Sequence, residues 1–182
     1  DERSASYFAL GRARRTGVPV GLLCTSGTAA ANFHPAVIEA NQARVPLVLL
    51  TADRPPELRD SGANQTIDQE KLYGDSVRWY RDLPEPGTSD RKLRRLRVDA
   101  ARAVAGATGT PAGPVHCNVP FRKPLEPIDV PGDEPADPEG LGAVGRDGPF
   151  VASSDGVQSP GSETVASVAD RVADATRVLI VA

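Results

Sequence analysis

The stretch GLLCTSGTAAAN occupies residues 21–32 and combines three kinds of sequence pattern. An apolar run ends at Cys24, the polar residues Thr-Ser-Gly-Thr follow, and a run of alanines then begins a helical pattern. This order predicts a buried strand, a tight turn and a helix. Gly27 can adopt a positive φ or allow another backbone to approach closely, and the amides at a helix N-terminus favour a polar ligand group. An ordinary helix cap after a strand is the alternative interpretation.

Strand and helix patterns alternate along the first two thirds of the chain. Strands are predicted at residues 18–24, 45–50, 76–83 and 115–120, and helices at residues 1–16, 29–43, 66–73 and 88–105. Strands that are joined through helices pair in parallel by right-handed crossovers. The sequence therefore predicts an α/β fold, a flavodoxin-like parallel sheet with helices on both faces, truncated at its N-terminus so that the first strand is lacking.

The composition argues against several classes of function. The chain has 182 residues and a formal net charge of −3, which gives no reason to expect nucleic acid or a membrane surface as a partner. It has no apolar run of about 18 residues, the length that a membrane span requires. Cys24 and Cys117 lie in apolar runs and are expected to be buried, reduced thiols, as in a cytoplasmic protein.

The composition also divides the chain into three parts. Residues 1–128 carry the α/β pattern, whereas residues 129–162 are rich in Gly, Pro, Asp, Glu and Ser, which is typical of a linker. Residues 163–175 are expected to form a helix and residues 177–182 a strand, and together they are expected to begin a second α/β domain. The sequence starts without methionine and ends in an apolar run, so we expect it to be a fragment of a longer protein.

Polar loops follow the predicted strands at their carboxyl ends, where open parallel sheets bind ligands. Arg54 lies in the loop after the second strand, and its guanidinium group suits a carboxylate or a phosphate because it presents paired N–H donors. An ion pair with Asp53, Glu57 or Asp60 is an equally open interpretation of Arg54.

A further polar loop carries Asn64 and Gln65 after a glycine. Their amides offer donors to a ligand, but such a pair more commonly caps the following helix. The sequence contains no G-x-G-x-x-G, P-loop, G-x-S-x-G or C-x-x-C motif. His34 and His116 are expected to be packing residues, since two histidines without thiolates at ligand spacing do not predict a zinc site.

Four segments together resemble a known family: DERSASYFALG (residues 1–11), LLCTSGTAAANFHPAVIEA (22–40), VPLVLLTADRPPELRDSGANQTIDQ (45–69) and VHCNVPFRKPL (115–125). They are similar to the thiamin diphosphate (ThDP) enzymes of the decarboxylase and acetolactate synthase type. Within these, TSGTAAAN and TADRPPELRDSGANQTIDQ resemble the synthase family of menaquinone biosynthesis. The resemblance covers residues 1 to about 127, and residues 163–182 look like the start of the family's middle domain.

The resemblance implies that the first domain binds the aminopyrimidine ring of ThDP. Glu2 matches the family's catalytic glutamate, whose carboxylate hydrogen-bonds a pyrimidine nitrogen and favours the imino tautomer that activates the cofactor. Thr25, Ser26, Gly27 and Thr28 match the turn that packs against the ring. Without the resemblance, Glu2 is only an acidic residue in the first turn of a helix.

The same resemblance implies a substrate site and a reaction. Arg54, Asn64 and Gln65 match positions that face the substrate, isochorismate, whose carboxylates require cationic and amide donors. The implied transferase decarboxylates 2-oxoglutarate and adds the resulting succinyl semialdehyde carbanion to isochorismate. A non-catalytic domain of this fold, acting in assembly or regulation, and another ThDP carboligase with a pyruvate-type donor are the alternatives.

The implied cofactors are ThDP with Mg²⁺ or Mn²⁺. In the family the cation and the diphosphate are held by a third domain, usually of a partner subunit, and no Gly-Asp-Gly metal motif in a suitable context occurs here. No metal ligand is therefore predicted in this chain. The full-length protein is expected to be a homodimer or homotetramer, and the chain alone is expected to be inactive.

Overall fold

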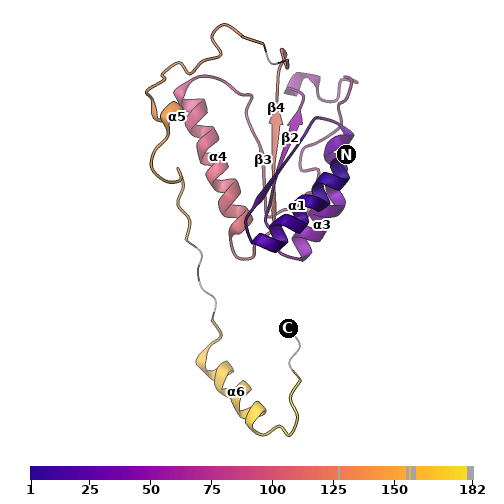
Figure 1. Ribbon diagram of the computed structural model, residues 1–182, viewed down its shortest axis with the longest axis vertical. Helices are drawn as coiled ribbons and strands as arrows, with labels where there is room; N and C mark the ends of the chain where they lie inside the picture. The colour runs from indigo at the N-terminus through magenta and orange to yellow at the C-terminus, as the bar shows by residue number, and fades with distance from the viewer. Residues whose placement is uncertain (127, 155, 157–158, 180–182) are drawn as a thin grey trace.

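The centre of the molecule is a parallel β-sheet. The computed structural model describes residues 1–179 except 127, 155 and 157–158, and within these the sheet has the strand order β1-β2-β4-β3. All neighbouring strands are parallel, so their carboxyl ends lie together at one end of the sheet (Figure 1). The strands are β1 (Val20–Cys24), β2 (Leu47–Asp53), β3 (Trp79–Asp82) and β4 (Pro114–Pro120).

Helices cover both faces of this sheet. The strands lie between α4 (Asp90–Thr108) on one side and the pair α1 (Glu2–Thr16) and α3 (His34–Gln42) on the other (Figure 1). The side chain of Asp1 accepts a hydrogen bond from the amide of Ser4 and caps α1, and Gly17 ends α1 with a φ of 70°. The predicted α/β class, a parallel sheet with helices on both faces, is confirmed.

Two apolar clusters hold the layers together. Phe33, Val37 and Leu49 are buried in the cluster between the sheet and α1 and α3. Val115 and Cys117 are buried in the cluster beneath α4. Alternate residues of β2 enter opposite cores, Leu47 and Leu49 on one face and Val48 and Leu50 on the other, which explains why residues 47–50 are all apolar.

The single helix predicted at residues 29–43 is wrong, because two helices occupy this stretch. α2 (Thr28–Ala31) ends at Asn32, and α3 begins at His34. Pro35 stands in the first turn of α3, where its missing N–H is tolerated. In one continuous helix Pro35 would leave the carbonyl of Ala31 without its donor and its ring would clash there, so the chain restarts instead.

The helix predicted at residues 66–73 is also absent, since this segment is a loop followed by the 3₁₀ turn η2 (Gly74–Ser76). Gln65 and Lys71 have φ values of 57° and 52°, which interrupt helical geometry on either side. Gln69 and Tyr73 are each only 1% exposed. A loop that buries a polar side chain this deeply is fixed by side-chain hydrogen bonds rather than by helical periodicity.

β1 lies at one edge of the sheet and is covered on one face only. Leu22 is buried beneath α1, whereas Leu23, which points to the other face, is 72% exposed. α4 lies over the other three strands and leaves an apolar hollow of about 480 Å³ beside β1. Leu23, Leu50 and Leu96 are among the residues that line it.

Part of the predicted linker packs on α4. The short helix α5 (Leu141–Val144) accepts hydrogen bonds from Arg97, whose Nε lies 2.7 Å from the carbonyl oxygen of Gly142 and whose Nη2 lies 2.6 Å from that of Ala143. The amide of Gly142 donates in turn to Asp90 at the start of α4. The boundaries of the linker and of the second domain remain predictions.

The last described helix is α6 (Ser162–Ala173), close to the helix predicted at residues 163–175. All of its residues are exposed. Residues 177–179 of the predicted final strand are not in a strand, and residues 180–182 lie outside the described residues.

Candidate functional site

The predicted cofactor turn, residues 25–28, leaves the carboxyl end of β1 and leads into α2. Gly27 has a φ of 84°, and a Cβ atom there would lie 3.2 Å from both Cγ and the backbone oxygen of Gln65. Glycine is therefore required by the backbone conformation and by the approach of Gln65. Thr25 and Thr28 are exposed, whereas Ser26 and Gly27 are buried.

Gln65 binds this turn directly. Its side-chain Nε2 donates to Thr25 Oγ1 at 2.8 Å and to the carbonyl oxygen of Ser26 at 3.1 Å. The hydroxyl of Ser26 donates back to the carbonyl oxygen of Gln65 at 3.0 Å. The structure thus brings together two predicted groups, the cofactor turn and the loop of Asn64 and Gln65, that are separated by almost forty residues.

Glu2 lies at the start of α1, and Figure 1 places the beginning of the chain toward the carboxyl ends of the strands. Burial raises the pKa of the Cys24 thiol to about 11, and the negative charge of Glu2 contributes to this shift. The start of α1, which carries Glu2, and the turn that follows Cys24 therefore lie toward the same end of the sheet.

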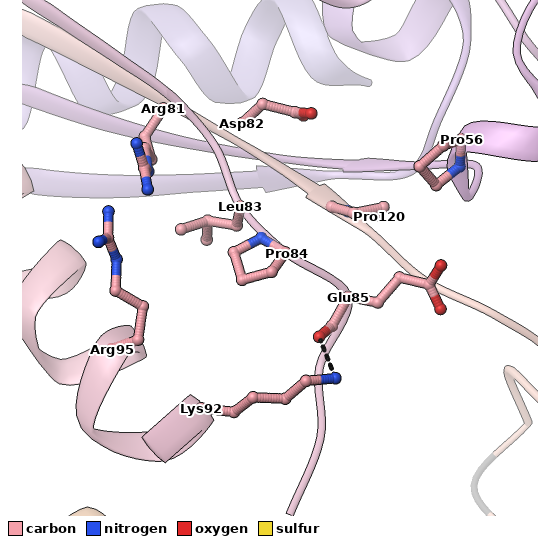
Figure 2. Close-up of a pocket in the computed structure, with 9 residues that line it drawn as sticks. All are labelled: Pro56, Arg81, Asp82, Leu83, Pro84, Glu85, Lys92, Arg95 and Pro120. Atoms are coloured by element: carbon pink, nitrogen blue, oxygen red, sulfur yellow. Dashed lines mark hydrogen bonds between the residues drawn. The ribbon is translucent and has the colours of Figure 1, made fainter. Parts of the chain in front are cut away.

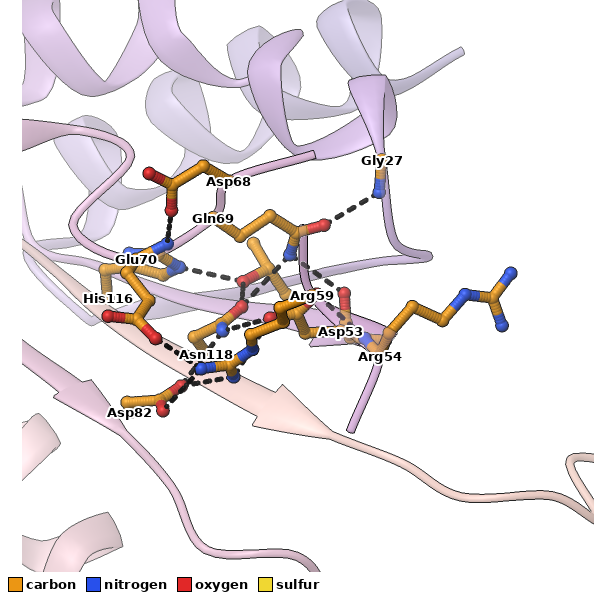
Figure 3. Close-up of polar contacts among 12 residues, drawn as sticks. Gly27, Asp53, Arg54, Arg59, Asp68, Gln69, Glu70, Asp82, His116 and Asn118 are labelled. Carbon is orange, nitrogen blue, oxygen red and sulfur yellow. Dashed lines mark hydrogen bonds and ion pairs between the residues drawn. The ribbon is translucent and has the colours of Figure 1, made fainter. Parts of the chain in front are cut away.

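Arg54 is free of the ion pairs that the sequence left open. Among the described residues, no salt bridge joins Arg54 to Asp53, Glu57 or Asp60. Its Nη2 donates to the carbonyl oxygen of Asn64 at 3.0 Å, and its guanidinium group points away from the side chains of Gln69 and Asn118 (Figure 3). Arg54 therefore links the two predicted substrate-facing loops and leaves donors for a ligand.

Arg59, which the sequence did not single out, makes the ion pairs instead. Its guanidinium group lies 3.1 Å from Asp53, which is buried, and 3.1 Å from Asp82, and it also pairs with Glu70. Burial opposes the charge of Arg59, but hydrogen bonds to Asp82 and the charges of Asp82, Asp53 and Glu70 outweigh it and raise the pKa of Arg59. Arg59 is consequently a structural cation.

A buried polar cluster lies below the turn and connects it to the sheet (Figure 3). Asn118 of β4 stands at its centre, in register with Thr51 of β2. Asn118 Oδ1 accepts hydrogen bonds from Thr51 Oγ1 at 2.9 Å and from Gln69 Nε2 at 3.0 Å. Its Nδ2 donates to Asp53 and Asp82. Polar residues inside two apolar strand runs were the signal in the sequence for this cluster.

His116 is a core residue, as predicted, and its tautomer follows from its partner. Thr51 gives its only hydroxyl proton to Asn118, so it must accept from His116 Nε2, 2.8 Å away. Burial lowers the pKa of His116 to about 4, although the charge of Asp82 acts in the opposite direction. His116 is therefore neutral at pH 7, with its proton on Nε2.

A larger hollow of about 650 Å³ lies beyond β3, beside α4 (Figure 2). Arg81 and Arg95 face one another there, and both approach the buried carboxylate of Asp99, at 3.7 and 2.7 Å. None of the predicted site residues lines this hollow. The charges around it are balanced within the protein, which does not favour an added anion.

Arg122, in the loop after β4, joins the loops that follow β2 and β3. It pairs with Glu57 and, through Nη2, with Glu85 Oε1 at 2.8 Å. The side chains of Arg122 and Glu57 are each at least half exposed. These pairs lie at the surface, in contrast to the pair of Arg59 with Asp53.

Two negative findings concern only the described part of the chain. It contains no group of three or more His, Cys, Asp or Glu side chains that could hold a metal ion. None of its helices combines the length and the apolar character that crossing a membrane demands.

Comparison with known proteins gives the geometry a family context. Residues 1–72 match the N-terminal TPP-binding domain of the thiamine pyrophosphate enzymes. Thiamine pyrophosphate (TPP) is another name for ThDP. With the parallel α/β fold, this match assigns residues 1–72 to the N-terminal domain of the ThDP enzymes, as the sequence resemblance predicted.

Along its whole length the chain is a relative of 2-succinyl-5-enolpyruvyl-6-hydroxy-3-cyclohexene-1-carboxylate synthase. It is 65% identical to the synthase of Haloarcula marismortui and 63% identical to that of Halorubrum lacusprofundi, with all of this chain matched in both cases. It is 53% identical to the synthase of Roseiflexus sp. over 92% of its length. The chain spans about a third of the length of these curated relatives, 32%, 29% and 30% respectively.

Proposed function

We propose that this chain supplies the pyrimidine-binding part of a synthase that uses ThDP. The synthase decarboxylates 2-oxoglutarate and joins the remaining succinyl semialdehyde unit to isochorismate in menaquinone biosynthesis. Identity of 61–65% over the whole chain to proteins named for this product supports the proposal. The observation that carries it is the direct hydrogen bonding between the turn at Thr25 and the amide of Gln65.

The residues at the turn fit a flat heteroaromatic ring. Thr25 and Thr28 are exposed and carry hydroxyls that can donate to a ring, and Gly27 between them allows the close approach of Gln65. Ser26 is buried and bonded to Gln65, so we assign it to holding the turn rather than to contacting the ring. When bound, ThDP supplies an electron sink for the carbon–carbon bond chemistry.

We assign Glu2 the role of holding a proton at a nitrogen of the pyrimidine ring. A carboxylate is suited to this because it accepts a strong hydrogen bond from a protonated ring nitrogen. The start of α1, which carries Glu2, lies toward the carboxyl ends of the strands, where β1 leads into residues 25–28, and this supports the assignment.

We assign Arg54 and Asn64 to binding the substrate carboxylates, and Gln65 to holding the substrate-facing loop against the turn, since both N–H donors of its side chain are used there. The hydrogen bond from Arg54 to the backbone of Asn64 keeps these residues together, and the free donors of the guanidinium group suit a carboxylate. A site that excludes water would strengthen each of these contacts.

Other features of the full-length enzyme belong to the same proposal. A divalent cation, Mg²⁺ or Mn²⁺, and the diphosphate would be bound outside this chain, and the enzyme would act as a homodimer or homotetramer in the cytoplasm. Within the chain, residues 1–128 would form the pyrimidine-binding domain, 129–162 the linker, and 163–182 the start of the middle domain. The free cysteines Cys24 and Cys117 are consistent with a reducing compartment.

The substitution Glu2→Gln in a full-length synthase carrying this chain tests the proposal. It keeps the size of the side chain but removes its charge, and we expect product formation from isochorismate and 2-oxoglutarate to be abolished. Glu39→Gln, on an exposed position of α3, is the matched control and should retain activity.

Two results would contradict this function. Unchanged activity of the Glu2→Gln enzyme would favour the alternative in which this domain has no part in catalysis. Turnover of pyruvate alone, with none of isochorismate and 2-oxoglutarate, would favour a carboligase with a pyruvate-type donor.

A further inference from the structure

Gln69 is an uncharged polar side chain that is buried in a loop without regular secondary structure, with 1% of its surface exposed. Its Oε1 accepts a 2.7 Å hydrogen bond from the amide of Gly27. Its Nε2 donates to the carbonyl oxygen of Ala52 and to Asn118 Oδ1, each at 3.0 Å. One side chain therefore connects the turn after β1 with β2 and β4.

The orientation of this amide is fixed by its partners. The group of Gly27 that faces Gln69 is its backbone N–H, so the amide atom opposite it must be the oxygen. Ala52 offers only a carbonyl oxygen, so the atom that faces it must be the nitrogen. A flipped amide would place two donors together and two acceptors together, all without access to water.

Asn118 is fixed in the same way, because its Nδ2 donates to the carboxylates of Asp53 and Asp82. Its Oδ1 must then face Gln69 and Thr51. Arg59 in turn forms ion pairs with both carboxylates. The side-chain amides of Gln69 and Asn118 accordingly have one arrangement in which the hydrogen bonds of both are satisfied (Figure 3).

We infer that Gln69 is a positioning residue for the cofactor: it fixes the backbone of residues 25–28 to the sheet, so that Thr25 and Thr28 present their hydroxyls in a set geometry. Gln65 holds the same turn from its other side. The inference rests on the proposed function, in which this turn meets the pyrimidine ring. Gln69 itself does not contact the ring, because all of its polar atoms are bonded within the protein.

The consequence is a separation of two kinetic constants. Without Gln69 the turn samples other conformations, and the cofactor must order it on binding. The apparent KM for ThDP should then rise about tenfold or more, the effect expected for the loss of one or two buried hydrogen bonds. At saturating ThDP the turn is ordered again, and kcat should change by less than about threefold.

The experiment uses a full-length synthase that carries this chain, with the substitution Gln69→Leu. Leucine has nearly the shape of glutamine but neither donates nor accepts. Hydrogen exchange of the peptide that contains residues 24–28 is measured without cofactor, and KM for ThDP and kcat are then measured with saturating Mg²⁺. Gln42→Leu, on an exposed residue of α3, is the control and should leave all three values unchanged.

A second variant, Gln69→Glu, keeps the experiment decisive if the leucine enzyme does not fold. One carboxylate oxygen can still accept from Gly27, but the other faces the oxygens of Ala52 and Asn118 and cannot donate to them. We expect it to raise both the exchange of residues 24–28 and the KM for ThDP.

Faster exchange together with the selective rise in KM would support the inference. Unchanged hydrogen exchange of residues 24–28 in both variants would overturn the inference, whether or not the KM for ThDP changes. Faster exchange with an unchanged KM would overturn the cofactor role alone and leave the proposed function standing. An unsubstituted synthase that does not bind ThDP would overturn the proposed function and, with it, this role of Gln69.

Discussion

Gly27 satisfies two separate demands at the centre of the candidate site, a φ of 84° and a close approach to Gln65. We predict that Gly27→Ala destabilises the chain by roughly 1–3 kcal/mol, because alanine is strained in this conformation and its methyl group presses on Gln65. Urea unfolding followed by circular dichroism measures the change. Gly11→Ala is the control, since Gly11 lies in α1 with open space around it and alanine there should stabilise by about 0.5–1 kcal/mol.

His116 should make the stability depend on pH. Its pKa is about 4 in the folded protein, lowered by burial from its ordinary 6.5. Between these values the unfolded chain binds more protons than the folded one, so stability rises with pH. The contribution of His116 is complete above about pH 6.5 and is lost as the pH falls to about 4, and it amounts to roughly 3 kcal/mol.

The test compares urea unfolding at pH 7 and pH 5. We expect the His116→Gln chain to lose less stability between these pH values than the unsubstituted chain loses. His34→Gln removes the other histidine and should keep the original dependence. An identical pH dependence for the His116→Gln chain would show that His116 is not the group that titrates.

The predicted site residues could be found in the sequence because they lie in polar loops after strands. The sequence could not show which of two arginines, Arg54 or Arg59, would form ion pairs within the protein. Arg54 and Arg59 lie five positions apart, and both are near acidic residues. The 3₁₀ turn η1 (Pro56–Leu58) redirects the chain, so that Arg59 returns to Asp53 while Arg54 points outward. Which of two similar side chains is buried depends on this local geometry and not on residue type.

At the scale of elements, α5 is held on α4 by a side chain rather than by an apolar core. Arg97 binds two of its carbonyl oxygens. We predict that Arg97→Ala releases residues 137–151 and increases their cleavage in limited proteolysis severalfold, because the helix is too short to persist alone. Arg102→Ala is the control, because Arg102 is an exposed residue of α4, the helix that carries Arg97. Equal cleavage of both variants would mean that other contacts hold α5.

The elements that could be predicted are those whose burial is continuous. The apolar runs of β2 and β4 and the cap and stop signals of α1 determine these elements locally. Pro35 was a signal for a helix break, but the run of alanines before it led to the prediction of one continuous helix. The loop around Gln69 has no local signal, since its shape comes from partners in β2 and β4.

At the scale of the whole molecule, the chain carries the proposed ring contacts but only part of the length of its relatives. We predict that the 182-residue chain alone neither turns over substrate nor binds ThDP with Mg²⁺, because the ring contacts at residues 25–28 are too few to order the cofactor. Isothermal titration calorimetry should show no binding heat above that of dilution. Tight binding with one site per chain would contradict this prediction.

Ionic strength distinguishes the two sets of ion pairs around the site. In about 1 M salt the Debye length is about 3 Å, so the surface pairs of Arg122 with Glu57 and Glu85 lose most of their attraction. Asp53 is buried beside Arg59 and is shielded from this screening. A concentrated electrolyte would therefore loosen the surface contacts between the loops after β2, β3 and β4, while the buried residues beneath those loops keep their positions.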